Sequence, residues 1–213
     1  MTGQRPSVHP IQCRCGALKG ELAVTRAANH GVCYCRDCRT YAFVLGRAGD
    51  VLDSLGGTDV IATLPRYVRF TAGIDKLACL SLSPRGALRW YASCCNTPIA
   101  NTPRDYRMPY AGFVRACLES GIRPIEEVFG PVNMRVNTSS VRGRVSTMPL
   151  TTVLAVLKFL SWLVPARLKG EYRLTPFFDG VGQPVVAVRV ISLEERNRAQ
   201  QAALDALATR QVR

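Results

Sequence analysis

The sequence predicts a mainly β protein with an α-containing C-terminal extension. Short β-prone runs recur at regular spacing in the first half, and helical periodicity appears in the second half. The chain has 213 residues and is 47% apolar. A chain of this length can bury about 70% of its unfolded surface, which excludes a disordered chain and a small disulfide scaffold. We expect one β domain over 11–109 and a helical or mixed extension over 110–213 that packs on it.

The β-prone runs of the first part are short and are separated by turn residues. They are Ala17–Val24, Asp59–Leu64, Arg66–Thr71, Lys76–Leu82 and Ala87–Tyr91. Residues 83–86 read Ser-Pro-Arg-Gly, with Pro at the second position of a turn and Gly at its last. The two runs that flank this turn should form a hairpin, and the whole set predicts a small antiparallel sheet assembly.

The pattern changes from about residue 110. One helix face is predicted from the spacing of Tyr110, Phe113, Val114, Cys117 and Leu118, with Gly121 as its end. The remaining expectations are a loop over Asn137–Thr147, an apolar helix from Pro149 to a stop at Pro165, a strand over Val185–Ile191 and a terminal helix to about Thr209. Residues 192–195 read Ser-Leu-Glu-Glu, which is a capping box at the start of that last helix.

The net charge of +13 comes from 28 basic and 15 acidic residues. A nucleic-acid partner is conceivable at such a charge, but the basic residues are spread along the chain and no long basic run marks a binding surface. The first ten residues are polar and contain no signal peptide, so we expect a cytoplasmic protein.

The longest apolar stretch is Leu150–Val164, which contains Lys158 and Ser161. It is shorter than the roughly 20 residues that cross a bilayer, so no transmembrane segment is expected. Its helix is apolar on nearly all sides, which favours burial in the core or in a homodimer interface. Docking on a membrane surface through Trp162, with Lys158 and Arg167, is the alternative.

Seven of the nine cysteines fall into three groups: Cys13 with Cys15, the triplet Cys33, Cys35 and Cys38, and the adjacent pair Cys94 and Cys95. In a reducing compartment, clustered cysteines serve more often as metal ligands or nucleophiles than as disulfides. Thiolates are ligands that zinc prefers, and the two pairs can supply one closed structural site of four sulfurs. The triplet would hold a second zinc with three ligands, which leaves the open position that catalytic sites need.

Simpler interpretations stay open for these residues. The triplet could be a structural site with a fourth ligand from elsewhere, or a site without metal, and Cys94 could be packed in the protein. Cys79 and Cys117 are expected in the core. His30 is expected in a loop without a ligand role, although it could orient or bind the metal, and His9 carries no signal.

Two arginines, Arg36 and Arg39, flank the triplet. A guanidinium group matches a carboxylate, so they are candidate substrate-binding residues. They could equally be solvated, or balance the negative charge of a zinc bound by three thiolates. Asp37 is expected to accept hydrogen bonds in a turn near the sulfurs.

Three motifs together resemble a known family. They are Cys-Arg-Cys-Gly at 13–16, Cys-Tyr-Cys-Arg-Asp-Cys-Arg at 33–39, and the region Tyr67–Ile99 with Arg-Trp-Tyr at 89–91 and Thr-Pro-Ile at 97–99. In this order they resemble the glutathione-dependent formaldehyde-activating enzyme family, which also includes centromere protein V. The resemblance covers residues 11–101. The sequence differs from the family pattern at Tyr34, Ala92 and Asn96, where the family has His, Cys and Gly.

The resemblance implies a β-tent fold of short antiparallel sheets with two zinc ions. A structural zinc would be bound by Cys13, Cys15, Cys94 and Cys95. A second zinc at Cys33, Cys35 and Cys38 would form the catalytic site, where the family is proposed to join formaldehyde and the thiol of glutathione. The implied activity is that of a carbon–sulfur lyase. The alternative is a zinc-stabilised, non-catalytic binding module for nucleic acid or a protein, for which centromere protein V is the precedent.

Overall fold

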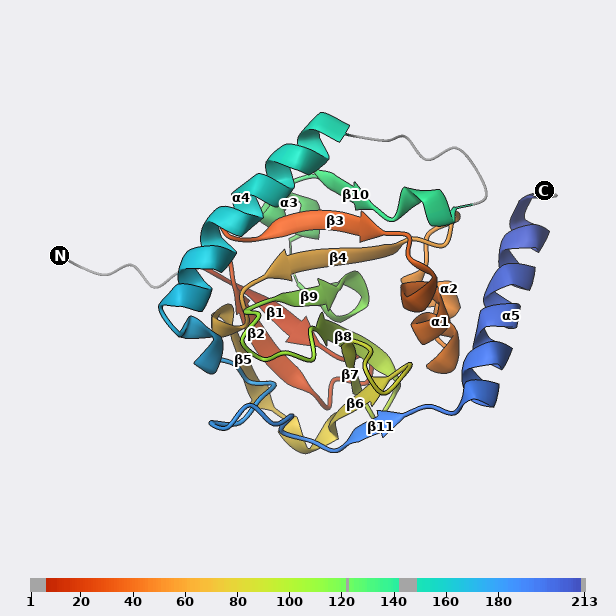
Figure 1. Ribbon diagram of the computed structural model, residues 1–213, viewed down its shortest axis with the longest axis horizontal. Coiled ribbons are helices and arrows are strands. Elements are labelled where there is room, and N and C mark those ends of the chain that lie inside the picture. Colours follow the sequence, from red (N-terminus) through yellow and green to blue (C-terminus); the bar gives the residue numbers. More distant parts are fainter. Residues whose placement is uncertain (1–6, 122, 142–148, 212–213) are drawn as a thin grey trace.

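The computed structural model describes residues 7–121, 123–141 and 149–211 (Figure 1). Within these residues the chain is a mixed α/β fold with two β-sheets and five α-helices. The sheets expected in the first part are present. The helices within and just after that part were not expected.

The larger sheet has eight strands in the order β10-β3-β4-β9-β8-β7-β6-β11. Their bounds are β3 Asn29–Cys33, β4 Thr58–Thr63, β6 Leu77–Ser81, β7 Leu88–Ala92, β8 Thr97–Thr102, β9 Ala111–Val114, β10 Met134–Val136 and β11 Val188–Val190. Neighbours are antiparallel except at the two edges, where β10 runs parallel to β3 and β11 runs parallel to β6. The antiparallel pairing of β6 with β7 confirms the predicted hairpin.

The smaller sheet has three antiparallel strands in the order β1-β2-β5. These are β1 Val8–Gln12, β2 Lys19–Ala23 and β5 Val68–Ala72. A shared core contains residues from both sheets, with Trp90 and Phe113 fully buried. Phe177, from the C-terminal part, joins this core with its ring centroid 4.9 Å from that of Trp90.

The helix predicted from Tyr110 is wrong. Ala111–Val114 forms β9, which pairs with β4 and β8 in the middle of the larger sheet, and Arg115–Cys117 is a single 3-10 turn. All four residues of β9 are buried, and a short run buried on both faces cannot be distinguished from a helix face by spacing alone. Cys117 nevertheless lies in the core, as expected, and so does Cys79 on β6.

The five α-helices within the described residues are α1 Arg36–Val44, α2 Ala48–Val51, α3 Ile125–Phe129, α4 Pro149–Leu168 and α5 Leu193–Gln211. Figure 1 shows α4 at the edge of the larger sheet that is formed by β10 and β3. It shows α5 on the opposite side of the molecule, beside α1. One half of the predicted capping box is present, because the Glu195 backbone N–H donates to Ser192 Oγ at 3.0 Å. The Glu195 carboxylate does not complete it but accepts from Arg189 instead.

Two expectations about the apolar helix are wrong. Pro165 does not end α4 but lies inside its last turns; it lacks the N–H that would donate to the Ser161 carbonyl, yet the helix continues to Leu168 and the Lys169 N–H donates to the Pro165 carbonyl at 2.9 Å. The helix is also not buried within the chain, since its buried residues are Ala155, Leu163 and Ala166. Leu150, Val153, Leu154, Val156, Leu157, Leu160, Trp162, Val164 and Leu168 are exposed.

The length of α4 differs from the expectation for Leu150–Val164. Within the described residues it is a helix of 20 residues, long and apolar enough to cross a membrane by length and composition alone, and 17% of the 18-residue window that meets this criterion is buried. Length therefore does not exclude a membrane segment. Packing of α4 against a second copy of the chain and docking of α4 on a membrane surface both stay predictions. The predicted loop over Asn137–Thr147 begins with a 3-10 turn at Thr138–Ser140, and residues 142–147 lie outside the described residues.

Candidate functional site

The first cysteine cluster joins two turns. Cys13 and Cys15 lie between β1 and β2, and Cys94 and Cys95 lie between β7 and β8. The Sγ atoms are separated by 3.6 Å for Cys13–Cys15, 3.8 Å for Cys13–Cys94, 3.2 Å for Cys15–Cys94 and 3.8 Å for Cys94–Cys95. A tetrahedral zinc with Zn–S bonds of about 2.3 Å separates its sulfurs by about 3.8 Å. The four sulfurs therefore suit one such ion.

Two residues with left-handed backbone shape these turns. Gly16 has φ +75° and donates its N–H to the Cys13 carbonyl at 2.8 Å, which closes the first turn. Asn96, at the position where the family resemblance expected Gly, has φ +53°. Asn tolerates this region better than most residues do, so the substitution keeps the shape of the turn. Ala92, at the expected Cys position, is fully buried, and Cys94 supplies a sulfur in the cluster.

Backbone and hydroxyl groups hold the cluster in place. The Leu18 N–H donates to Cys13 Sγ at 3.2 Å, and Thr97 Oγ1 lies 3.0 Å from Cys95 Sγ. Thr97 Oγ1 also accepts the Arg14 N–H at 3.0 Å, which ties the two turns together. Burial raises the pKa of Cys95, but hydrogen bonds from Thr97 and Cys15 outweigh burial and bring that pKa to about 6. The cluster thus contains a thiolate at neutral pH, which is the form that binds metal.

The second cluster lies where β3 meets α1. Cys33 is the last residue of β3, Cys35 caps α1, and Cys38 is in its first turn. Cys33 Sγ is 3.7 Å from Cys38 Sγ, and all three sulfurs lie within 4.8 Å of one another. The Cys38 N–H donates to Cys35 Sγ at 3.3 Å, and Asn137 Nδ2 donates to Cys33 Sγ at 3.4 Å.

Negative charge is favoured on one of these sulfurs, that of Cys33. Hydrogen bonds from Cys35 and Cys38 hold the pKa of Cys33 far below its ordinary value. The same interactions raise the pKa of Cys38, because its proton is retained between neighbouring sulfurs. The N-terminus of a helix also stabilises a nearby anion. Within the described residues, no fourth Cys, His, Asp or Glu joins the group, so a metal bound here would have three protein ligands.

The two histidines lie in strands and belong to neither cluster. His30 is on β3, not in a loop as expected, and it is fully buried. Its Nε2 is 2.9 Å from Asp59 Oδ1 and its Nδ1 is 2.7 Å from the Gly130 carbonyl. His9, on β1, is also buried, with Nε2 2.8 Å from the Leu118 carbonyl. Tyr34, where the family has His, donates its hydroxyl to Asp53 at 3.1 Å.

Three arginines surround the triplet, and the sequence singled out two of them as binding residues. Arg36 is exposed at the start of α1, whereas Arg39 is only 5% exposed and donates from Nη2 to the Ser140 carbonyl at 2.8 Å. The third is Arg89 on β7, which is also 5% exposed. Its Nη1 is 3.9 Å from Cys38 Sγ and donates to Asn101 Oδ1 at 3.1 Å.

Arg89 stands in the third motif, but the sequence did not identify it as part of the site, because it approaches Cys38 through packing of β7 against α1, 51 residues apart in the chain. The alternation of side chains along β7 could have placed Arg89 and Tyr91 on one face of the strand. It could not have shown which element covers that face. In the structure α1 lies there, and the Arg89 guanidinium is 5.2 Å from the centre of the Tyr41 ring.

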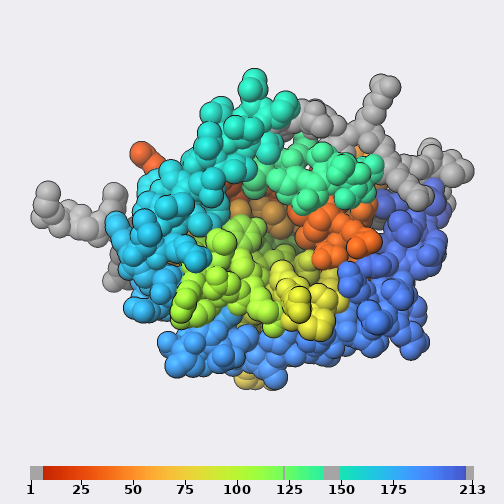
Figure 2. Space-filling view, in the orientation of Figure 1, coloured from red at the N-terminus to blue at the C-terminus, as the bar shows by residue number. Residues whose placement is uncertain are grey.

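A cavity of ≈ 610 Å³ opens beside the triplet. Its lining comes from α1, β7, the Thr138–Ser140 turn and α5: Cys35, Arg36, Asp37, Arg39, Arg89, Ser140, Gln200, Ala203, Leu204 and Leu207. Figure 2 shows the C-terminal helix, in blue, against the orange residues that include the start of α1. The arrangement brings one cysteine of the triplet, Cys35, and three guanidinium groups to one cavity.

Fold and clusters together define a mixed α/β protein with a four-cysteine group and a three-cysteine group, each placed as a metal site would be. The chain belongs to a family of unknown function, DUF6151, whose model matches residues 6–189. Among solved structures it is similar to the crystal structure of a Rhodobacter sphaeroides protein, with 21% identity and a TM-score of 0.41, over 58% of this chain and 96% of that chain. No curated protein matches the sequence significantly.

Proposed function

We propose that the protein binds two zinc ions and is an enzyme of the carbon–sulfur lyase type, which joins or splits a small aldehyde and a thiol such as glutathione. The observation that carries this proposal is the group of three sulfurs at the start of α1, without a fourth protein ligand in the described residues and beside a cavity. A closed four-ligand site would be structural, whereas three protein ligands suit a catalytic metal.

The two clusters have different parts in this proposal. Cys13, Cys15, Cys94 and Cys95 would hold the structural zinc, since their four sulfurs complete its coordination. Cys33, Cys35 and Cys38 would hold the second zinc, which can lower the pKa of a bound thiol and polarise a carbonyl. The proposal extends to the β-tent fold and to kinship with the formaldehyde-activating family, supported by the order of the three motifs.

The residues around the second cluster would bind and orient the substrate. Asn137 and the Cys38 N–H donate to sulfurs of the triplet, so both fix the ligand positions. Arg89 places a buried positive charge 3.9 Å from Cys38 Sγ, which offsets the negative charge of three thiolates. Arg36 and Arg39 would attract an anionic substrate to the cavity. We also propose that 11–109 carries the zinc sites, while 110–213 adds β9 to the sheet and α5 to the cavity wall.

Elemental analysis tests the metal part of this proposal. We expect two zinc ions per chain in the protein purified without added metal, and about one in Cys35→Ser. Cys79→Ala is the control, because Cys79 is a buried cysteine outside both clusters, and it should keep two ions. One ion that is unaffected by Cys35→Ser would mean that the triplet holds no zinc, which would overturn the enzyme proposal in favour of a binding module.

Turnover tests the chemical part. With two ions bound, the protein should accelerate formation or breakdown of the formaldehyde–glutathione adduct, and Cys35→Ser should abolish this acceleration while the four-cysteine zinc remains. Zinc at both sites with no acceleration of any thiol–aldehyde pair would contradict the lyase assignment.

A further inference from the structure

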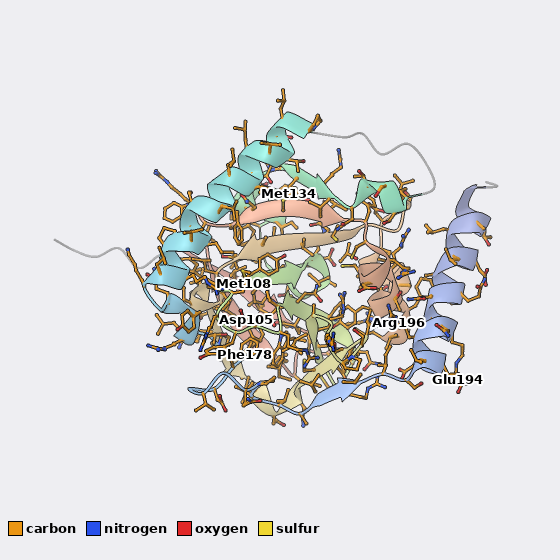
Figure 3. The ribbon with its side chains drawn as sticks, viewed as in Figure 1. Asp105, Met108, Met134, Phe178, Glu194 and Arg196 are labelled. Atoms are coloured by element: carbon orange, nitrogen blue, oxygen red, sulfur yellow. The ribbon has the colours of Figure 1, made fainter. Side chains whose placement is uncertain are left out.

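The wall of the cavity opposite α1 is the C-terminal helix α5. Small residues on its inner face, Ala199 and Ala203, are buried and allow close approach to α1. Figure 3 shows Arg196 on the side of α5 that faces α1, and its Nη2 is 3.9 Å from Asp37 Oδ1. The cavity therefore owes its shape to a helix that has no counterpart in the cysteine motifs.

Two buried hydrogen-bond donors of this cavity have no partner among the described residues. They are Arg39 Nη1 and Gln200 Nε2, from α1 and α5. Arg39 is 5% exposed, and its other terminal nitrogen is held by the Ser140 carbonyl. A buried donor without a partner costs about 1–3 kcal/mol, and more when it is charged. Two such donors, on residues that line one cavity, are the expected arrangement for a ligand that accepts a hydrogen bond from each.

The charge around the donors selects the kind of ligand. Arg36, Arg39 and Arg89 line the cavity, and Asp37 is the acidic residue of that lining. The Asp37 carboxylate already faces Arg196. The cavity thus carries excess positive charge, and a guanidinium group binds a carboxylate through a planar pair of hydrogen bonds.

We propose that α1 and α5 together form a binding site for the carboxylate of a small substrate, with Arg39 and Gln200 as its ligands. The other end of the substrate lies toward Cys35, which lines the same cavity. This carboxylate site adds a substrate class to the proposed function. It rests on that proposal only for the other end of the substrate, where a thiol would reach the metal. The C-terminal helix then determines which thiols the protein accepts.

Cobalt-substituted protein gives a direct measurement, because a thiol that binds Co²⁺ changes its visible absorption. The probes are mercaptoacetate, 3-mercaptopropionate and 4-mercaptobutyrate, which carry a carboxylate, and 2-mercaptoethanol, which does not. At least one mercaptocarboxylate should bind about tenfold more tightly than 2-mercaptoethanol, as expected for a charged hydrogen-bonded pair.

Two adjacent glutamines provide matched variants. Gln200→Glu places a negative charge in the cavity and should remove the tenfold preference for a mercaptocarboxylate over 2-mercaptoethanol. Gln201→Glu makes the same change one residue away, on the exposed face where Gln201 bonds Asp205, and should keep the preference. Arg39→Gln should also remove it, and circular dichroism checks that this variant folds without the full contact to Ser140.

Each outcome decides one of the two proposals. Equal affinity of wild type for thiols with and without carboxylate, or a preference that survives both Gln200→Glu and Arg39→Gln, overturns the carboxylate site. If no thiol changes the cobalt spectrum, the open metal position is refuted, and calorimetry with succinate and inorganic phosphate then tests the carboxylate site alone. Succinate binding that Arg39→Gln abolishes supports it. No succinate binding, or binding of phosphate only, overturns it.

Discussion

His30 can make both of its hydrogen bonds only when its ring is protonated. Nε2 faces Asp59 Oδ1 and Nδ1 faces the Gly130 carbonyl, and both of these oxygens are acceptors. A neutral imidazole has one N–H, so it satisfies one of them. Burial lowers the pKa of His30, but the hydrogen bonds to Asp59 and Gly130 and the charges of Asp59 and Glu126 outweigh burial and raise that pKa.

The sign of the pH dependence follows from the raised pKa. The stabilisation by the charged ring is complete below the unfolded pKa of about 6.5 and is lost as the pH rises through the folded value. Loss of one charged hydrogen bond in a buried site costs about 1.5–3 kcal/mol. We therefore expect the free energy of unfolding of wild type minus that of His30→Gln to fall as the pH rises from below about 6.5 through the folded pKa of His30, by at most about 2 kcal/mol, because burial opposes the charged ring.

Urea unfolding of the zinc-loaded protein at several pH values measures this difference. Comparison with His30→Gln cancels the pH dependence of the thiolate sites, which both proteins share. His9→Gln is the matched control, because it changes the other buried histidine and should keep the pH dependence due to His30. A difference between wild type and His30→Gln that is flat or rises with pH would refute the reasoning.

Three other variants test the clusters and α4. Cys94→Ser should lose one zinc per chain and several degrees of melting temperature, measured by elemental analysis and calorimetry, and retention of both ions would show that Cys94 is not a ligand. Gly16→Ala should lower the free energy of unfolding by about 1–2 kcal/mol in urea, because φ is +75° there, and an unchanged value would contradict the strain. Leu157→Glu, at a side chain 57% exposed, should change stability by less than about 0.5 kcal/mol. It should turn a homodimer into a monomer in sedimentation, and wild type that is already monomeric would refute an α4 dimer.

Local patterns predicted those features whose causes are local. The Ser83–Gly86 turn and its hairpin depend on residues within a few positions of one another, and so does the contact between Ser192 and Glu195. The grouping of the cysteines was also predicted, because each short motif places its sulfurs on a single turn. The meeting of the turn with Cys13 and Cys15 and the turn with Cys94 and Cys95 was predicted from the four ligands that a zinc ion needs, and not from periodicity.

Features that depend on sheet pairing could not be predicted in this way. Residues 110–118 have the spacing of a helix face, but their first half forms strand β9, because it pairs with β4 and β8. Arg89 reaches Cys38 only because β7 and α1 pack together, and Gln200 reaches the same cavity from α5, 161 residues after Arg39. The motif around Arg89 does not indicate this contact and Gln200 stands in no motif, so only the tertiary structure reveals their places.

The fold connects the two cysteine clusters through one strand. The turn that carries Cys94 and Cys95 directly follows β7, and Arg89 on the same strand lies against Cys38. A zinc held by the four-cysteine group would fix the end of β7 to the turn between β1 and β2, since Cys13 and Cys15 are its other ligands. The position of Arg89 beside the triplet would then depend on that zinc. A metal in the four-cysteine group would accordingly support the three-cysteine group by holding the guanidinium group beside Cys38, and would not only stabilise the fold.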